Sequence, residues 1–138
     1  MNDVNDPCRG PIHPKAMEGI LYFNKGMYYE AHEALEDAWK VEGDPIRDLY
    51  KGILQAAVFY FHLERQNYKG VVKMYARSQK WLNGWPEICR GIHIGQLRED
   101  LDAVMARVRR LGPEKISAID PASFNPITWN EMEAHDHE

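Results

Sequence analysis

Residues 28–39, YYEAHEALEDAW, place one histidine and several acidic side chains among aromatic residues on what reads as a single helix. His32 and Glu36 stand four positions apart, so an imidazole and a carboxylate share one edge of that helix. Such a pair can bind a divalent metal or exchange protons near neutral pH. The zinc-protease motif His-Glu-x-x-His is not formed, because Glu36 occupies the place of its second histidine.

A second set of polar residues lies on the apolar segment 46–64. At helical spacing, one stripe of this segment comprises Lys51, Gln55, Val58, Phe59 and His62. Polar groups on so apolar a helix need partners, because burying them unpaired is costly. The simplest arrangement brings the edge carrying His32 and Glu36 against this stripe. The sequence therefore predicts a polar cluster of His32, Glu36, Gln55 and His62.

Three interpretations of this cluster stay open. As a structural network, it would fix the register of the two helices through satisfied hydrogen bonds. As a metal site, His32, Glu36 and His62 would supply two imidazoles and a carboxylate, although the repeated Glu-x-x-His pattern of di-metal bundles is absent. As a metal-free acid/base site, Glu36 would tune His32, although no nucleophile stands beside the pair.

The elements that must position these residues are all helical. Apolar residues at helical spacing, ended by Gly, Asn or Pro, predict helices over about 15–24, 27–41, 46–64, 68–82 and 94–111. Asp44 and Pro45 provide a capping residue and a first-turn proline before the third helix. No strand pattern is apparent in the sequence. The predicted fold class is all-α, a compact multi-helix bundle of two consecutive helical hairpins and a fifth helix.

The chain divides into three parts on the same signals. Residues 1–13 form an irregular, proline-containing lead, residues 14–112 form the helical-bundle domain, and residues 113–138 form an extended or flexible tail. A length of 138 residues with 44% hydrophobic residues is enough for one domain with an adequate core.

Composition narrows the function classes. Seventeen basic and twenty-one acidic residues give a formal charge of −4, which makes nucleic acid an unlikely partner. The most apolar run, 52–63, is about half the roughly 20 residues that a membrane-spanning helix needs, so no membrane insertion is expected. Cys8 and Cys89 are far apart without CxxC spacing, and the first residues are polar where a secretory signal would be apolar. These features predict a cytoplasmic protein.

The order of motifs in residues 16–82 resembles the DUF309 family, a small bacterial and archaeal family of unknown function. The resemblance rests on the strings FN-x-G, EAHE-x-LE-x-x-W, the Ile-Leu-Gln and His of the third helix, and N-Y-x-G. It implies a compact helical bundle inside the cell, with no established activity. Its characteristic residues fall on Gly26, Glu30, His32, Glu33, Leu35, Glu36, Trp39, Gln55, His62 and Gly70.

The function that these observations favour is a binding or interaction module with a polar cluster between its second and third helices. The alternative is a small metal-dependent or acid/base enzyme that uses the same cluster. The strings NKGMYYEA and RQNYKGVV also suggest a weak helical repeat, a feature of modules that bind peptides or partner subunits. A protein partner or self-association is therefore conceivable, whereas the sequence identifies no cofactor, substrate or catalytic residue.

Overall fold

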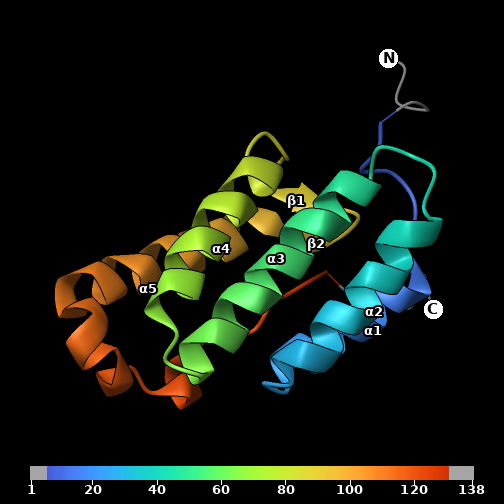
Figure 1. The fold of residues 1–138 in the computed structure, drawn as a ribbon. Helices are drawn as coiled ribbons and strands as arrows, with labels where there is room; N and C mark the ends of the chain where they lie inside the picture. The colour runs from blue at the N-terminus through green and yellow to red at the C-terminus, as the bar shows by residue number, and fades with distance from the viewer. Residues whose placement is uncertain (1–5, 131–138) are drawn as a thin grey trace.

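The computed structural model describes residues 6–130, and this part of the chain is mainly helical (Figure 1). The prediction of an all-α fold is confirmed. The helices are α1 (Pro14–Asn24), α2 (Tyr28–Val41), α3 (Arg47–Glu64), α4 (Tyr68–Leu82) and α5 (Ile94–Lys115). Two short strands, β1 (Ile88–Cys89) and β2 (Ile92–His93), and two 3-10 turns, η2 (Ile116–Ala118) and η3 (Pro121–Ser123), complete the described elements.

Local chemistry sets the ends of these helices. The Oδ1 of Asn67 accepts a hydrogen bond from the amide N–H of Gly70 at 3.1 Å, so Asn67 caps α4, whose bounds match the prediction. His13 caps α1 in the same way, because its Nδ1 accepts from the amide N–H of Lys15 at 2.9 Å. Gly112 has φ of 74° and interrupts α5 where the sequence predicts its end.

Helix α3 lies between α2 and α4, and α1 packs against α2 (Figure 1). This central position explains why α3 is apolar around most of its circumference. Ile53 and Ala57 are fully buried, as their place in the helix predicts. Leu54 and Phe61, also expected in the core, are only half-buried, because they line surface cavities beside α2.

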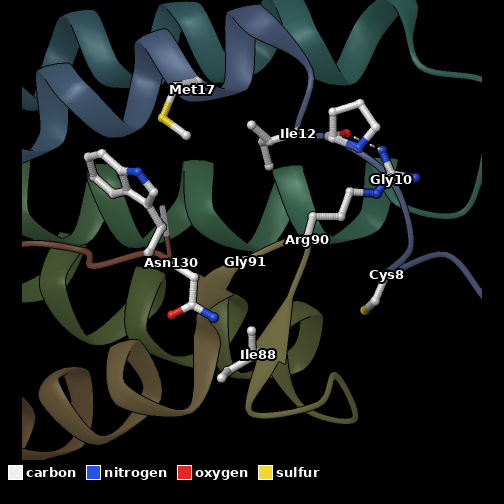
Figure 2. A pocket seen from close by; sticks show the side chains of 10 residues that line it. Cys8, Gly10, Ile12, Met17, Ile88, Arg90, Gly91 and Asn130 are labelled. Carbon is white, nitrogen blue, oxygen red and sulfur yellow. Dashed lines mark hydrogen bonds between the residues drawn. The ribbon is translucent and has the colours of Figure 1, made fainter. Parts of the chain in front are cut away.

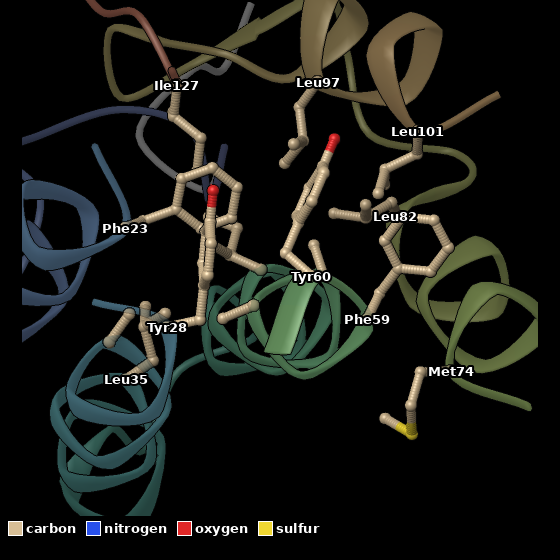
Figure 3. Close-up of a cluster of buried hydrophobic side chains, with 14 of the residues drawn as sticks. Phe23, Tyr28, Leu35, Phe59, Tyr60, Met74, Leu82, Leu97, Leu101 and Ile127 are labelled. Atoms are coloured by element: carbon tan, nitrogen blue, oxygen red, sulfur yellow. The ribbon is translucent and has the colours of Figure 1, made fainter. Parts of the chain in front are cut away.

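The core is organised around aromatic rings on one side of α3 (Figure 3). Tyr28 and Tyr60 stack with ring centroids 5.3 Å apart, and the ring of Phe23 meets Tyr60 edge-on at 5.4 Å. Leu97 and Leu101 of α5 cover these rings (Figure 3). Burial raises the pKa of Tyr28 to about 12, so its phenol stays neutral inside the core.

A β-hairpin was not expected from the sequence. Strands β1 and β2 pair antiparallel across Arg90 and Gly91, which have φ of 50° and 81°. Positive φ at both central residues is the geometry that suits a two-residue hairpin turn. Ile92 also forms a β-bridge with Trp129, so the hairpin ties the C-terminal segment to the bundle.

Two further features of the described residues were not expected from the sequence. Cys8 and Cys89 form a disulfide, a pairing that their spacing did not predict. The segment after α5 is not loosely attached over the part that the structure describes, because Ile119 and Ile127 are buried and the side chain of Asn24 bonds both the N–H and the C=O of Ile127. Residues 131–138 of the expected tail lie outside the described residues.

None of the helices within residues 6–130 combines the length and apolar character needed to cross a membrane. The division of the chain into lead, bundle and tail stays a prediction.

Candidate functional site

Helix α2 separates its side chains as its sequence predicts. Ala31, Leu35 and Ala38 are buried against the bundle, while Glu33 and Asp37 are exposed on the opposite face. His32 and Glu36 are half-buried on the edge between these two faces. The edge points toward α3, and the two helices enclose two cavities there.

The larger cavity has a volume of about 260 Å³. Its lining residues are His32, Glu36 and Trp39 from α2, and Lys51, Leu54 and Gln55 from α3. A second cavity of about 130 Å³ is lined by Tyr28, Tyr29, His32, Val58, Phe61 and His62. His32 borders both cavities, and the two together are here called the α2–α3 groove, defined by these lining residues.

The groove contains all four residues of the predicted cluster, but they do not form a network. Within residues 6–130, no hydrogen bond joins any two of His32, Glu36, Gln55 and His62. Glu36 instead lies 4.0 Å from the ammonium of Lys40 in an exposed ion pair, which contributes at most about 1 kcal/mol. The residues are neighbours along a surface rather than members of one hydrogen-bonded core.

His62 is held by the turn between α3 and α4. Its Nδ1 lies 3.2 Å from the Nδ2 of Asn67, the residue that caps α4. Burial, and secondarily the positive charges of Arg65 and Lys73, lower the pKa of His62. The imidazole therefore favours its neutral form, in which Nδ1 can accept a hydrogen bond from Asn67.

Metal binding by this set is not supported by the arrangement of side chains. Across residues 6–130, no group of three His, Cys, Asp or Glu side chains is close enough together to hold a metal ion. His32, Glu36 and His62 are therefore not assembled as such a group.

Gln55 has an unusual environment for a polar side chain. The residue is only 8% exposed, and its Oε1 is buried without a hydrogen-bond partner among the described residues. Unpaired buried oxygens are rare in native proteins, because each costs about 1–3 kcal/mol of desolvation. Gln55 lines the larger cavity, but its Oε1 is turned away from solvent, so the amide must rotate before a ligand in the groove can reach this oxygen.

One end of the groove carries cations over indole rings, a feature that the sequence analysis missed. The ammonium of Lys51 lies 4.7 Å from the ring centroid of Trp39 and 5.1 Å from that of Trp81. The guanidinium of Arg47 lies 4.8 Å from the Trp39 centroid. Neither cation has a carboxylate within ion-pair distance in the described chain. Lys51 lines the groove together with the carboxylate of Glu36, and Arg47 lies beside this end without being one of the lining residues.

The other end of the groove is apolar and aromatic. Tyr29 is 52% exposed, and its ring centroid is 5.9 Å from that of Phe61. The predicted stripe on α3 was wrong at one position: Phe59 is fully buried against Tyr60 and Tyr75 in the core, and Phe61 faces the groove. The helical spacing of Leu54, Val58 and Phe61, at i, i+4 and i+7, could have identified this face.

The comparisons with known proteins identify relatives of unknown function. An uncharacterised protein of Aquifex aeolicus (strain VF5) is 27% identical over 89 residues, which are 64% of this chain and 27% of that protein. The uncharacterised protein YpuF of Bacillus subtilis (strain 168) is 31% identical over 109 residues, which are 75% of this chain and 63% of YpuF. The matched regions thus span less than two thirds of either relative.

A family model described as "Domain of unknown function (DUF309)" matches residues 16–74. The matched region runs from α1 into α4 and contains the α2–α3 groove with His32, Glu36, Gln55 and His62. Over this helical region, the chain matches the DUF309 family model, a finding consistent with membership of that family.

Proposed function

We propose that the chain is a binding module whose α2–α3 groove receives a peptide segment of a partner protein. The observation that carries this proposal is the unpaired Oε1 of Gln55 in the wall of the groove. After a rotation of the Gln55 amide toward the groove, a backbone N–H of a bound peptide would satisfy this oxygen and offset the desolvation that the free protein bears.

The two ends of the groove define the side chains of such a peptide. Tyr29, Val58 and Phe61 offer an apolar surface for aliphatic or aromatic side chains. Lys51 and Arg47, which have no carboxylate partner in the described part of the chain, would attract an acidic side chain. The fitting ligand is therefore an apolar peptide segment with an acidic residue toward the N-terminal end of α3.

One relative carries a similar unit within a longer chain, because the matched region is 27% of the Aquifex protein. In stacked helical repeats, the concave surface between successive helices is the surface that binds partners.

Selection from a phage-displayed random peptide library tests the proposal. Peptides selected on the unmodified chain are then titrated by fluorescence anisotropy against three variants. Gln55→Leu and Tyr29→Ala should weaken binding by about tenfold, which corresponds to one lost hydrogen bond or aromatic contact. Leu21→Ala is the matched control, because Leu21 is 44% exposed on α1 and borders neither cavity of the groove.

The proposal fails if no peptide is selected, or if all three variants bind the selected peptides as the unmodified chain does. A second copy of the chain is the other partner that a groove of this kind could accept. Analytical ultracentrifugation of the chain alone distinguishes this case. Concentration-dependent dimerisation that Tyr29→Ala abolishes would show that the groove binds a second copy of the chain instead of a peptide.

Acid/base catalysis by Glu36 and His32 stays a prediction without a supporting contact, since neither side chain bonds the other. A cytoplasmic location also stays a prediction. The Cys8–Cys89 disulfide gives it a direct test, because reducing compartments keep protein thiols reduced. Alkylation of the chain at the moment of cell lysis should label both cysteines if the location is cytoplasmic.

A further inference from the structure

A cavity of about 600 Å³ lies away from the α2–α3 groove (Figure 2). It forms where the N-terminal segment, the β-hairpin and the segment around Trp129 meet. In Figure 2, Ile12 and Met17 lie on one side of this cavity, and Ile88 and Asn130 lie on the other. The volume is within the range of about 300–1,000 Å³ that is typical of small-molecule sites.

The lining is mainly apolar, and Arg90 and Asn130 are its polar side chains. Most of the wall is supplied by Ile12, Met17, Ile88 and Trp129. Among the lining residues within 6–130, Arg90 is the one ionisable side chain, since Cys8 is held in a disulfide, and none is acidic. The electrostatic character of this site is therefore set by a single guanidinium.

The charge of Arg90 is held in place but is not neutralised. Its Nε donates to the carbonyl of Pro7 at 2.8 Å, and its Nη1 donates to the carbonyl of Pro11 at 3.0 Å. Both acceptors are neutral. No carboxylate within residues 6–130 lies at ion-pair distance from Arg90. The hydroxyl of Tyr50 is a further neutral partner of this side chain. A guanidinium has five N–H donors, so Arg90 keeps donors for an anion.

The walls of the cavity are cross-linked. The disulfide joins Cys8 of the N-terminal segment to Cys89 of β1. On the other side, the amide N–H of Asn130 donates to the carbonyl of Gly91 at 2.7 Å, and that of His93 donates to Thr128 at 3.0 Å. A cavity fixed in this way needs little reorganisation before it binds a ligand.

We propose that this cavity is a binding site for a small amphipathic anion, a ligand with an apolar ring or short chain and one carboxylate or sulfonate group. The apolar part contacts Ile12, Met17, Ile88 and Trp129, and the anionic group pairs with Arg90. The site shares no residue with the α2–α3 groove, so it stands independently of the proposed peptide binding.

Two fluorescent probes that differ in one charge test this proposal. 8-Anilino-1-naphthalenesulfonate carries the anionic group, and N-phenyl-1-naphthylamine is its uncharged counterpart. The oxidised protein should bind the sulfonate probe with one-to-one stoichiometry. Arg90→Gln should lower the affinity for the sulfonate probe by about tenfold or more, because one charge-assisted hydrogen bond is lost. The affinity for the neutral probe should change by less than about twofold. Arg90→Lys should retain most of the sulfonate binding.

Blocking the cavity provides a test that does not depend on Arg90. Ile88 is 49% exposed at the rim, so Ile88→Trp can occupy the opening without disturbing the core. This variant should bind both probes more weakly than the unmodified chain does. Val41→Trp is the matched control, because Val41 is 69% exposed on α2 and does not line the cavity, and it should bind both probes normally.

Displacement of the sulfonate probe by decanoate or by 2-naphthoate then tells whether the site prefers a chain or a ring. The proposal is overturned if neither carboxylate displaces the probe, or if Ile88→Trp and Val41→Trp have equal effects. It is also overturned if the Arg90→Gln variant, shown by circular dichroism to be folded, loses affinity for both probes equally. Should Arg90→Gln fail to fold, the comparison of Ile88→Trp with Val41→Trp and the displacement series decide the matter.

Discussion

Gly70 lies directly beneath the imidazole of His62: a Cβ atom built on Gly70 would stand 2.6 Å from the Cγ of His62. No side chain fits at that distance, so the close approach of α4 to the end of α3 depends on glycine. The Nδ1 of the same imidazole lies 3.2 Å from the Nδ2 of Asn67, the residue that caps α4. His62, Asn67 and Gly70 therefore form one packing unit at the turn between the two helices.

Gly70→Ala should lower the free energy of unfolding by about 1–3 kcal/mol, the usual cost of overpacking. Helix propensity alone predicts the opposite sign, since alanine is favoured over glycine by about 1 kcal/mol within a helix. Urea denaturation decides between the two. Gly43→Ala is the control, because a Cβ at Gly43 meets no atom within 4 Å, and it should leave stability unchanged or slightly higher.

Two adjacent positions on α3 should differ in their response to truncation. Ile53 is fully buried, so Ile53→Ala should cost about 2–5 kcal/mol of stability, as in other close-packed cores. Leu54 is half-buried at the α2–α3 groove, so Leu54→Ala should cost clearly less. Equal losses in a denaturant titration would show that the groove side of α3 is covered in solution.

The bundle was predictable because its signals are local. The apolar periodicity of each helix and the residues that end it, such as Asn67 before α4 and Gly112 in α5, lie within one or two turns of the boundary they determine. The groove followed from the same periodicity, which places His32 and Glu36 on the edge of α2.

The features that escaped prediction depend on contacts between distant segments. The pairing of Cys8 with Cys89 spans 81 residues, and nothing in either local sequence indicates the other. Burial of Ile127 likewise depends on hydrogen bonds to Asn24. The hairpin had only a weak local signal, because its turn is Arg90-Gly91 and lacks the Asn-Gly or Asp-Gly pair that typically marks a two-residue turn.

Reduction of the Cys8–Cys89 disulfide should lower the free energy of unfolding by about 2–4 kcal/mol, because a crosslink over 81 residues restricts the unfolded chain. The measurement is urea denaturation with and without dithiothreitol. In a Cys8→Ala/Cys89→Ala variant, the reductant should have no effect. An identical response of the unmodified chain under both conditions would mean that the bond does not contribute to stability.

Stability should depend on pH through His62. Its folded-state pKa lies below the usual value of 6.5, so between these two values the unfolded chain binds more protons than the folded chain. The stabilisation from neutral His62 is therefore present above pH 6.5 and is lost as the pH falls through this window. Comparing the free energy of unfolding at pH 7.5 and pH 5 in the unmodified chain and in His62→Gln isolates the effect. The variant should lose less stability on acidification, and an equal loss in both would contradict the assignment.

Gln55 should respond to substitution as a residue kept for binding rather than for folding. Its buried Oε1 has no partner, so Gln55→Leu removes an unsatisfied oxygen and should raise the free energy of unfolding by about 1 kcal/mol. Gln79 is the matched control, because its Nε2 donates to the Oδ1 of Asp102 at 2.9 Å. Gln79→Leu loses this bond and should lower stability by about 0.5–1.5 kcal/mol.

Thermal or urea denaturation measures both variants. Changes of opposite sign in the free energy of unfolding would distinguish a binding position with an unpaired oxygen from an ordinary structural position. A loss of stability in Gln55→Leu as large as that in Gln79→Leu would show that the amide of Gln55 already has a partner in the free protein. The groove would then lack the unpaired oxygen on which peptide binding was argued, whatever the apolar surface of Tyr29 and Phe61 contributes.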